Sequence, residues 1–204
     1  MYKKVYYTIT ENIKENSITR KGRLNLNMVY KTVKLKDGRT ATLDWLKESD
    51  LPELVEALNS VIREEKYLLM DNEITDMEEE RRWFERGTKE GMLYLVARVD
   101  DKIFGGASIH PQTNKRSHVA EFGIFIRDGY RNLGLGTTLT NIFTEIARER
   151  GFEILQLSVN ATNKRALHVY KKYGYRECGR FTRDIKFADG TYTDRILMEL
   201  LLKQ

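Results

Sequence analysis

Apolar residues recur at three- and four-residue steps in four stretches of the chain. This spacing gives each stretch one apolar face and predicts four helices. Asp50 is the candidate N-cap of the first helix. The second helix is expected to bury Trp83 and Phe84, and Thr75 and Glu78 before it stand at capping-box spacing. The helices are expected over residues 51–62, 76–88, 135–150 and 164–173.

Runs of β-branched and aromatic residues between these helices predict strands. Asp100–Asp101 and Asp189–Gly190 are the expected turns of two hairpins. Residues 1–37 are strand-like and basic, and we read them as an N-terminal extension, either a hairpin or an arm of a homodimer, before a domain over 38–204. The strands are expected over residues 5–9, 28–30, 40–43, 92–99, 102–109, 118–126, 152–159, 180–187 and 192–200.

The segment from Ile126 to Leu139 is a candidate anion site. A strand ends in a short polar loop that contains Gly134 and Gly136, and the longest predicted helix follows. The first backbone N–H groups of a helix have no partner within it, and they lie at the positive end of the helix dipole. Glycine lets a ligand approach this backbone, and Arg131 adds a cation. We therefore expect a phosphate group to bind here.

Two common phosphate-binding loops do not fit this spacing. A Walker A loop requires Gly-Lys-Ser/Thr at the position where Leu135-Gly136 stand. A dinucleotide-binding loop requires a small third residue, and that position holds Leu139. Taken alone, the loop could also be a glycine-capped connection that binds no ligand.

The segment after this helix makes the pattern more specific. A strand candidate over 152–159 is followed by Asn-x-x-Ala-x-x-x-Tyr-x-x-x-Gly-Tyr over 163–175, which is a capped helix with a glycine stop. This order of elements resembles that of the GNAT superfamily of acyl-CoA-dependent N-acetyltransferases. The order is a strand, an Arg-x-x-Gly-x-Gly loop, a helix, a strand and then this second element. The resemblance is tight from about 121 to 175 and looser from about 40 to 200.

The resemblance implies an α/β fold of the α+β type. The GNAT fold has a central mixed, mostly antiparallel twisted sheet of about six or seven strands, flanked by about four helices. The N-terminal β extension would be added to it. The family also has a bulge that splays the strand before the glycine loop from its neighbour, so the strand over 118–126 is expected to separate in this way.

The resemblance also assigns a cofactor, acetyl-CoA. Its pyrophosphate would rest on the glycine loop, and its pantetheine arm would pair with the backbone of the preceding strand. Asn163 corresponds to an asparagine that steadies this arm, although it can equally serve as a simple helix cap. The implied cofactor-binding residues are Ile124, Phe125, Ile126, Arg131, Asn132, Leu133, Gly134, Leu135, Gly136, Thr137 and Asn163.

Tyr170 and Glu121 are the candidate catalytic residues. Tyr170 corresponds to the family tyrosine near the thioester sulfur, and a phenol with an ordinary pKa of about 10 can protonate a leaving thiolate. The alternative is a packed tyrosine at helical spacing. Glu121 is the candidate base for the amine, with a pKa raised by burial on a central strand. Its alternative is an ion pair with a basic residue on a neighbouring strand.

The reaction also needs a donor for the oxyanion of its tetrahedral intermediate. A backbone N–H between Ile124 and Ile126 is the expected donor. The predicted activity is transfer of the acetyl group by direct attack of a primary amine, which is a small amine, an amino acid or a protein N-terminus. The alternatives are transfer of a larger acyl group, such as succinyl or propionyl, and a catalytically silent acyl-CoA-binding or regulatory domain.

Composition narrows the possible classes of protein. With 204 residues, of which 41% are hydrophobic and 2 are proline, the chain is expected to fold rather than to be disordered. It has no apolar run of membrane-spanning length and no signal-peptide core, so we expect a cytoplasmic protein. Cys178, the single cysteine, is expected to be buried. The three histidines lack metal-ligand spacing, so no metal is expected.

The charge of the chain does not point to nucleic acid. The net charge is +5, but the 32% of residues that are charged have both signs interspersed, and no nucleic-acid motif is recognisable. Basic residues gather at Lys164, Arg165, Lys171 and Lys172, on the helix that contains Tyr170. They could attract the phosphates of the coenzyme, or they could simply form a solvated helix face.

Overall fold

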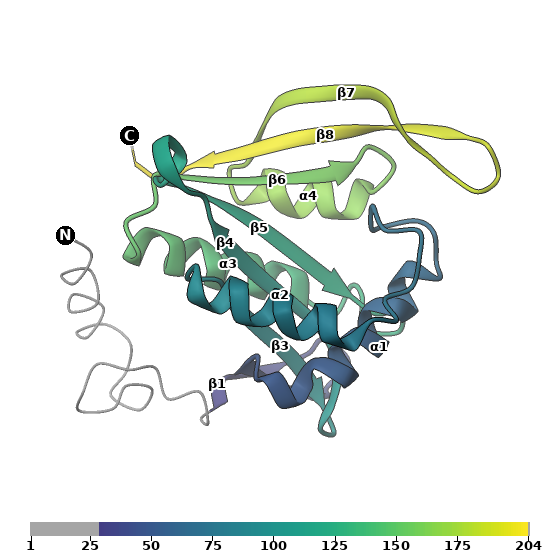
Figure 1. Cartoon of the computed structure of the whole chain (residues 1–204), viewed down its shortest axis with the longest axis vertical. Coiled ribbons are helices and arrows are strands. Elements are labelled where there is room, and N and C mark those ends of the chain that lie inside the picture. Colours follow the sequence, from purple (N-terminus) through teal and green to yellow (C-terminus); the bar gives the residue numbers. More distant parts are fainter. Residues whose placement is uncertain (1–28, 204) are drawn as a thin grey trace.

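The computed structural model in Figure 1 describes residues 29–203 of the chain. Within this range, eight strands form one sheet in the order β1-β2-β3-β4-β5-β6-β8-β7. Neighbouring strands are antiparallel except β5 and β6, which are parallel. The strands are β1 (Val29–Lys34), β2 (Thr40–Trp45), β3 (Leu93–Val99), β4 (Lys102–Pro111), β5 (Val119–Ile126), β6 (Ile154–Asn160), β7 (Arg176–Lys186) and β8 (Tyr192–Leu201).

The sheet confirms the predicted mixed, mostly antiparallel arrangement, with slightly more strands than expected. The additional strand is β1, which pairs with β2 and forms one edge of the sheet. The turn between them is closed by the backbone N–H of Gly38, which donates to Leu35 at 3.0 Å. The last part of the predicted N-terminal extension therefore forms a hairpin with the next strand. The other candidate strand, over 5–9, lies outside the described residues.

Four α-helices cover the two faces of the sheet in the described part of the chain. Alternate residues of a strand point to opposite faces. Phe122 joins the apolar cluster under α3, whereas Phe125 joins the cluster under α1. In Figure 1, α1 and α2 lie in front of the sheet and α3 lies behind it. The helices are α1 (Leu51–Ile62), α2 (Met77–Lys89), α3 (Leu135–Glu149) and α4 (Lys164–Lys172).

The start of α1 differs from the predicted cap. Asp50 belongs to a short 3-10 turn, Glu48–Asp50, and its side chain makes no capping hydrogen bond. Its carboxylate instead pairs with the guanidinium of Arg98 on β3 at 2.8 Å. Glu53 of α1 also pairs with Arg98, at 3.0 Å. These contacts fix the beginning of α1 against the sheet.

The cap of α2 also differs from the prediction. Asp76, rather than Thr75, accepts from the backbone N–H groups of the first turn, at 2.9 and 3.0 Å. Asp76 has the extended backbone that a cap requires, and it directly precedes the helix. Trp83 and Phe84 are half-buried and pack against the cluster under α1, which agrees with their predicted orientation.

Cys178 is exposed, so the prediction of a buried thiol is wrong. It lies on β7, which begins four residues earlier than expected and forms an edge of the sheet. Most residues of β7 are exposed.

The strands β5 and β6 separate along their length. They pair over three residues, from Val119↔Ile154 to Glu121↔Gln156, and then each continues beside its other neighbour. This confirms the predicted separation. The register of β4 and β5 is continuous from Gly105↔Ile126 to Pro111↔Ala120, so the expected bulge is wrong for this stretch, all of which lies in the described range. The separation needs no bulge because the parallel pairing is short.

Candidate active site

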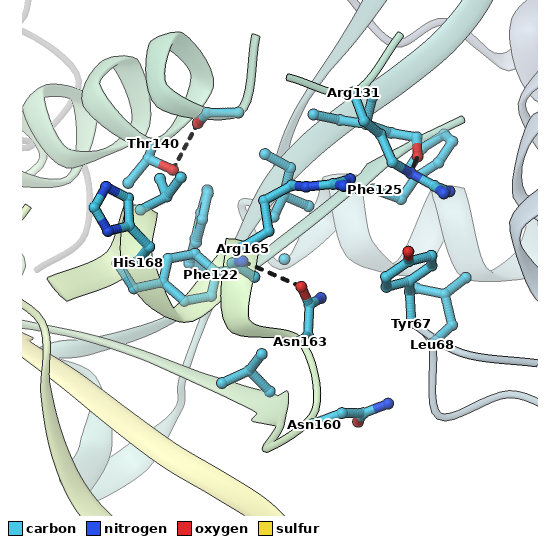
Figure 2. A pocket seen from close by; sticks show the side chains of 18 of the residues that line it. Tyr67, Leu68, Phe122, Phe125, Arg131, Thr140, Asn160, Asn163, Arg165 and His168 are labelled. Atoms are coloured by element: carbon cyan, nitrogen blue, oxygen red, sulfur yellow. Dashed lines mark hydrogen bonds between the residues drawn. The ribbon is translucent and has the colours of Figure 1, made fainter. Parts of the chain in front are cut away.

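A cavity of about 720 Å³ lies at the gap between β5 and β6, and residues from both faces of the sheet line it. Figure 2 shows this cavity, with His168 and Thr140 on one side and Tyr67 and Leu68 on the other. Most of the predicted cofactor-binding residues are brought together here. Those that line it are Ile124, Phe125, Ile126, Arg131, Asn132, Gly134, Gly136, Thr137 and Asn163.

Two residues predicted to bind the cofactor, Leu133 and Leu135, are absent from the cavity lining within the described range. Leu135 is 1% exposed and lies in the core under α3. Leu133 packs against the same core, and its carbonyl accepts from the backbone N–H of Lys36 at 3.2 Å. Any contact of these two residues with a ligand would have to come from their backbone.

The backbone of β5 presents hydrogen-bonding groups to the gap. At the end of the β4–β5 ladder, Arg127 N donates to Phe104 O at 2.8 Å. Because these bonds alternate along an antiparallel ladder, the backbone groups of Phe125 face β4. Those of Ile124 and Ile126 face the gap instead, where β6 has moved away. A ligand that enters the gap therefore meets two N–H groups of β5.

The start of α3 forms a cradle for an anion. Gly134 caps the helix with a φ of +94°, a conformation that favours glycine, and the helix begins at the next residue. The N–H groups of the first turn have no partner within the helix. Lys36 also lines the cavity here, and its side chain forms no ion pair with any residue of 29–203. Sequence reasoning missed Lys36, because it reaches the site from a turn a hundred residues away.

Arg131 lines the cavity, but its charge is already paired. Both terminal nitrogens donate to the carboxylate of Glu64, one of them at 2.6 Å, and Nε donates to the carbonyl of Ile126 at 2.8 Å. The guanidinium also stacks on the ring of Tyr67, 4.3 Å from its centroid. This differs from the free cation that the sequence predicted. Figure 2 shows Arg131 beside Phe125, above Tyr67.

Tyr170 lines the cavity from the face covered by α3 and α4. It is 6% exposed and packs edge-on against Phe122, with ring centroids 6.4 Å apart. Burial raises the pKa of Tyr170 well above its ordinary value. The phenol therefore keeps its proton at neutral pH, which a proton donor requires.

Glu121 lines the cavity from the opposite face of the sheet, which α1 and α2 cover. It is exposed, so the expected burial of this carboxylate is wrong. Its cross-strand neighbours are His110 on β4 and Gln156 on β6. No lysine or arginine within residues 29–203 forms an ion pair with Glu121, which contradicts the alternative of a structural ion pair. Tyr170 and Glu121 thus flank the gap from its two sides.

Asn163 caps α4 as predicted, since its side chain accepts from Ala166 N at 3.1 Å, the bond drawn in Figure 2. It also lines the cavity, so both suggested roles remain open to it. Of the basic residues on this helix, Arg165 and Lys172 line the cavity. His168, on the same helix, is exposed and lies at the rim of the cavity.

The loop between α1 and α2 contributes a wall that sequence reasoning did not identify. Four consecutive residues of this loop line the cavity: Tyr67, Leu68, Leu69 and Met70. The signal was an apolar run inside a loop, where polar residues are usual. The side-chain amide of Asn160, at the end of β6, donates to Lys66 O at 3.0 Å and holds this loop beside the gap.

Known proteins share this pattern of sequence and structure. The profile of the acetyltransferase (GNAT) family matches residues 55–175, more than half of the chain. The chain belongs to this family. It is an N-acetyltransferase of the GNAT family that uses acetyl-CoA as its acetyl donor.

Individual GNAT acetyltransferases differ in the part of this chain that they match. The L-amino acid N-acetyltransferase AaaT of Escherichia coli is 32% identical over 119 residues, which are 57% of this chain and 73% of that protein. The spermidine N(1)-acetyltransferase of the same species is 29% identical over 64% of this chain and 62% of its own length. A GNAT acetyltransferase structure from Streptococcus pneumoniae superposes with a TM-score of 0.72, at 29% identity, over 79% of this chain and 99% of that one.

Two further properties of this GNAT acetyltransferase concern residues 29–203. No helix in that range combines the length and the apolar character that crossing a membrane requires. Among the same residues, no three His, Cys, Asp or Glu side chains are gathered so that they could bind a metal ion.

Proposed function

We propose that this acetyltransferase transfers the acetyl group of acetyl-CoA directly to a primary amine in the gap between β5 and β6. The observation that carries the proposal is the placement of a protonated phenol and an exposed carboxylate, Tyr170 and Glu121, on opposite sides of this gap. A donor bound between them would have its sulfur near the acid and its carbonyl open to attack from the side of the base.

The surroundings of the gap fit acetyl-CoA. The first N–H groups of α3 and the amino group of Lys36 would hold the pyrophosphate. The C=O of Ile124 and one of the N–H groups of Ile124 and Ile126 would pair with the amides of the pantetheine arm, as an added strand does, and the other N–H is left for the oxyanion. Asn163, near the end of β6, would steady the same arm. Arg131 is left out of the phosphate site because Glu64 already neutralises it.

The chemistry removes two protons from the nitrogen and adds one to the sulfur. A primary amine is mostly protonated at neutral pH, so Glu121 takes the first proton from it, directly or through one water molecule. The amine nitrogen then bonds to the thioester carbon, and the N–H of Ile124 or Ile126 stabilises the oxyanion of the tetrahedral intermediate. When the C–S bond breaks, the hydroxyl of Tyr170 gives its proton to the thiolate. The nitrogen loses its second proton to solvent, and a proton from solvent restores the phenol. No covalent bond to the enzyme forms.

The acceptor is an amine whose identity depends on the second half of the cavity. A small amine, an amino acid and a protein N-terminus all satisfy the chemistry, and the name of the AaaT relative specifies L-amino acids. Acetyl is the proposed group, because the named relatives are acetyltransferases; a larger acyl group such as propionyl is the alternative.

The kinetics of two variants test this proposal. The change of Glu121 to Gln should lower kcat/KM by about 100-fold, because the amide cannot accept a proton from the amine. The change of Tyr170 to Phe should lower kcat by a similar factor while the Kd of acetyl-CoA stays within about twofold. Release of free thiol measures the rates, and calorimetry measures Kd.

Matched controls separate these effects from general damage. Glu153→Gln removes the exposed carboxylate of the residue just before β6. Tyr173→Phe alters another tyrosine, next to α4. Neither residue lines the cavity, so both variants should retain wild-type rates. Full activity of the Glu121 and Tyr170 variants would refute the assigned roles. Binding of acetyl-CoA without thiol release from any amine would favour the catalytically silent alternative.

A further inference from the structure

We propose that the acceptor is a primary amine with an apolar group attached beside it, such as an apolar amino acid or the apolar first residue of a peptide. This rests on the proposed function and concerns the half of the cavity that faces α1 and α2.

The wall of the cavity on this side is apolar and exposed. Leu69 and Met70, in the loop between α1 and α2, have 55% and 46% of their surface exposed, and both line the cavity. Such side chains gain free energy when a ligand covers them. They extend a surface that Tyr67, Leu68 and Val61 begin nearer the sheet.

The charges of the cavity disfavour acceptors with several ammonium groups. Among the described residues that line it, Glu121 is the one carboxylate, and it is assigned to the reacting amine. Glu64 stands near the wall, but it is paired with Arg131. A polyamine would bring a second cation without an anionic partner, and removal of that cation from water would cost free energy. A lysine side chain with a blocked α-amine has one cation, but the polar amide groups at the other end of its side chain would meet the apolar wall.

The position of the wall is fixed at three points. Glu64 is paired with Arg131, and Lys66 O accepts from the buried amide of Asn160. Farther along the loop, Asn59 of α1 binds both backbone groups of Ile74, at 2.8 and 3.0 Å. The apolar residues therefore lie at a defined place beside the gap, on the side where Glu121 would receive the amine.

Steady-state kinetics with a panel of amines tests the proposal. The panel contains L-leucine, L-methionine, a peptide that begins with methionine, spermidine, and lysine blocked at its α-amine. We expect the highest kcat/KM for an apolar amine, by about tenfold or more over spermidine and blocked lysine. The amino acids and the peptide distinguish a free metabolite from a protein N-terminus as the source of the apolar amine.

Variants of the exposed wall make the test specific. Leu69→Ser and Met70→Ser should each lower kcat/KM for the apolar amine by about tenfold, with the KM of acetyl-CoA within about twofold of wild type. Leu201→Ser changes a residue that is also exposed, at 40%, but lies on β8 outside the cavity lining, and it should have no effect.

Three results would overturn the proposal. Faster acetylation of spermidine or blocked lysine would show a different acceptor class and leave the proposed function intact. A raised KM for acetyl-CoA in the Leu69 and Met70 variants, with an unchanged KM for the amine, would assign the wall to the donor. Failure to acetylate any amine would refute the proposed function together with this inference.

Discussion

At the scale of single residues, buried tyrosines distinguish this molecule. Tyr170 and Tyr175 pack against each other with ring centroids 5.7 Å apart, and burial raises the pKa of both. For Tyr170 this preserves the proton that the proposed mechanism uses. The hydroxyl of Tyr175 is buried and has no hydrogen-bond partner among the described residues, while the nearby hydroxyl of Thr144 donates elsewhere, to Thr140 O at 2.8 Å.

Tyr175→Phe should therefore stabilise the protein. A buried hydroxyl without a hydrogen bond costs about 1–3 kcal/mol, so its removal should raise the free energy of unfolding by about 1 kcal/mol at pH 7. The gain should grow above pH 10, because there the unfolded chain loses the phenol proton while the folded protein keeps it. Urea denaturation at pH 7 and at pH 10.5 measures both effects.

The comparison for this measurement is Tyr173→Phe, which also removes a phenol hydroxyl, but from a half-buried tyrosine next to α4. It should not show the gain in stability that is expected for Tyr175→Phe. A Tyr175→Phe variant that is less stable than wild type at both pH values would show that its hydroxyl makes a favourable interaction.

Residues also show where sequence reasoning reaches its limit. The capping role of Asn163 could be predicted because cap and helix are adjacent in the chain. The pairing of Arg131 with Glu64 could not, because the partners are 67 residues apart. The exposure of Glu121 could not be predicted either, because it depends on which elements cover that face of β5, and no local pattern encodes this.

At the scale of elements, the loop between α1 and α2 joins the two halves of the proposed site. Arg131 stands at the beginning of the phosphate loop, and Glu64 stands in the turn that follows α1. Their side chains are 11% and 26% exposed, so the pair is shielded from solvent screening. It thus ties the wall for the acceptor to the cradle for the donor.

Glu64→Gln should separate the contributions of these two halves. Loss of the ion pair loosens the loop, so the KM of the amine should rise by about tenfold, in keeping with about 1–2 kcal/mol for a charge-assisted hydrogen bond. The affinity for acetyl-CoA should stay the same or increase, because Arg131 becomes free beside the phosphate site. Steady-state kinetics with each substrate varied in turn measures the two constants.

Glu65→Gln is the matched control, since Glu65 is exposed and forms no ion pair within residues 29–203. It should behave as wild type. A large loss of acetyl-CoA affinity in Glu64→Gln, with the KM of the amine unchanged, would contradict the positioning role of this pair.

Elements with strong periodicity were predictable from the sequence. Five apolar residues of α3 at helical spacing are all buried, because a helix with one apolar stripe has one way to face the sheet: Leu135, Leu139, Ile142, Phe143 and Ile146. The loop over residues 63–76 has no such period, and long-range contacts determine its path.

At the scale of the whole molecule, the fold produces the site by leaving two strands apart. Strands β1 to β5 form a continuous antiparallel sheet, β6 to β8 form a second antiparallel group, and three parallel residue pairs join them. The apolar cluster under α3 and α4 contains residues of both groups and holds them together. The opening between them can then admit a long ligand without breaking the core.

The order of motifs in the sequence predicts this architecture. It does not predict how deep the opening is or which residues line it. The order of strand, glycine loop, helix and strand identified the family. Close packing at β4 shows one hidden requirement: a Cβ at Gly106 would lie 2.7 Å from Tyr94. The sequence shows the glycine, but it does not show that the ring of Tyr94 packs too closely for a larger residue.

A crystal structure of the protein with acetyl-CoA tests the central claim most directly. We predict that the pyrophosphate contacts the N–H groups at the beginning of α3, that the pantetheine arm lies between β5 and β6 along Ile124 and Ile126, and that the thioester sulfur lies within hydrogen-bonding distance of the Tyr170 hydroxyl. Acetyl-CoA bound on another surface, with β5 and β6 unchanged and nothing between them, would contradict the account.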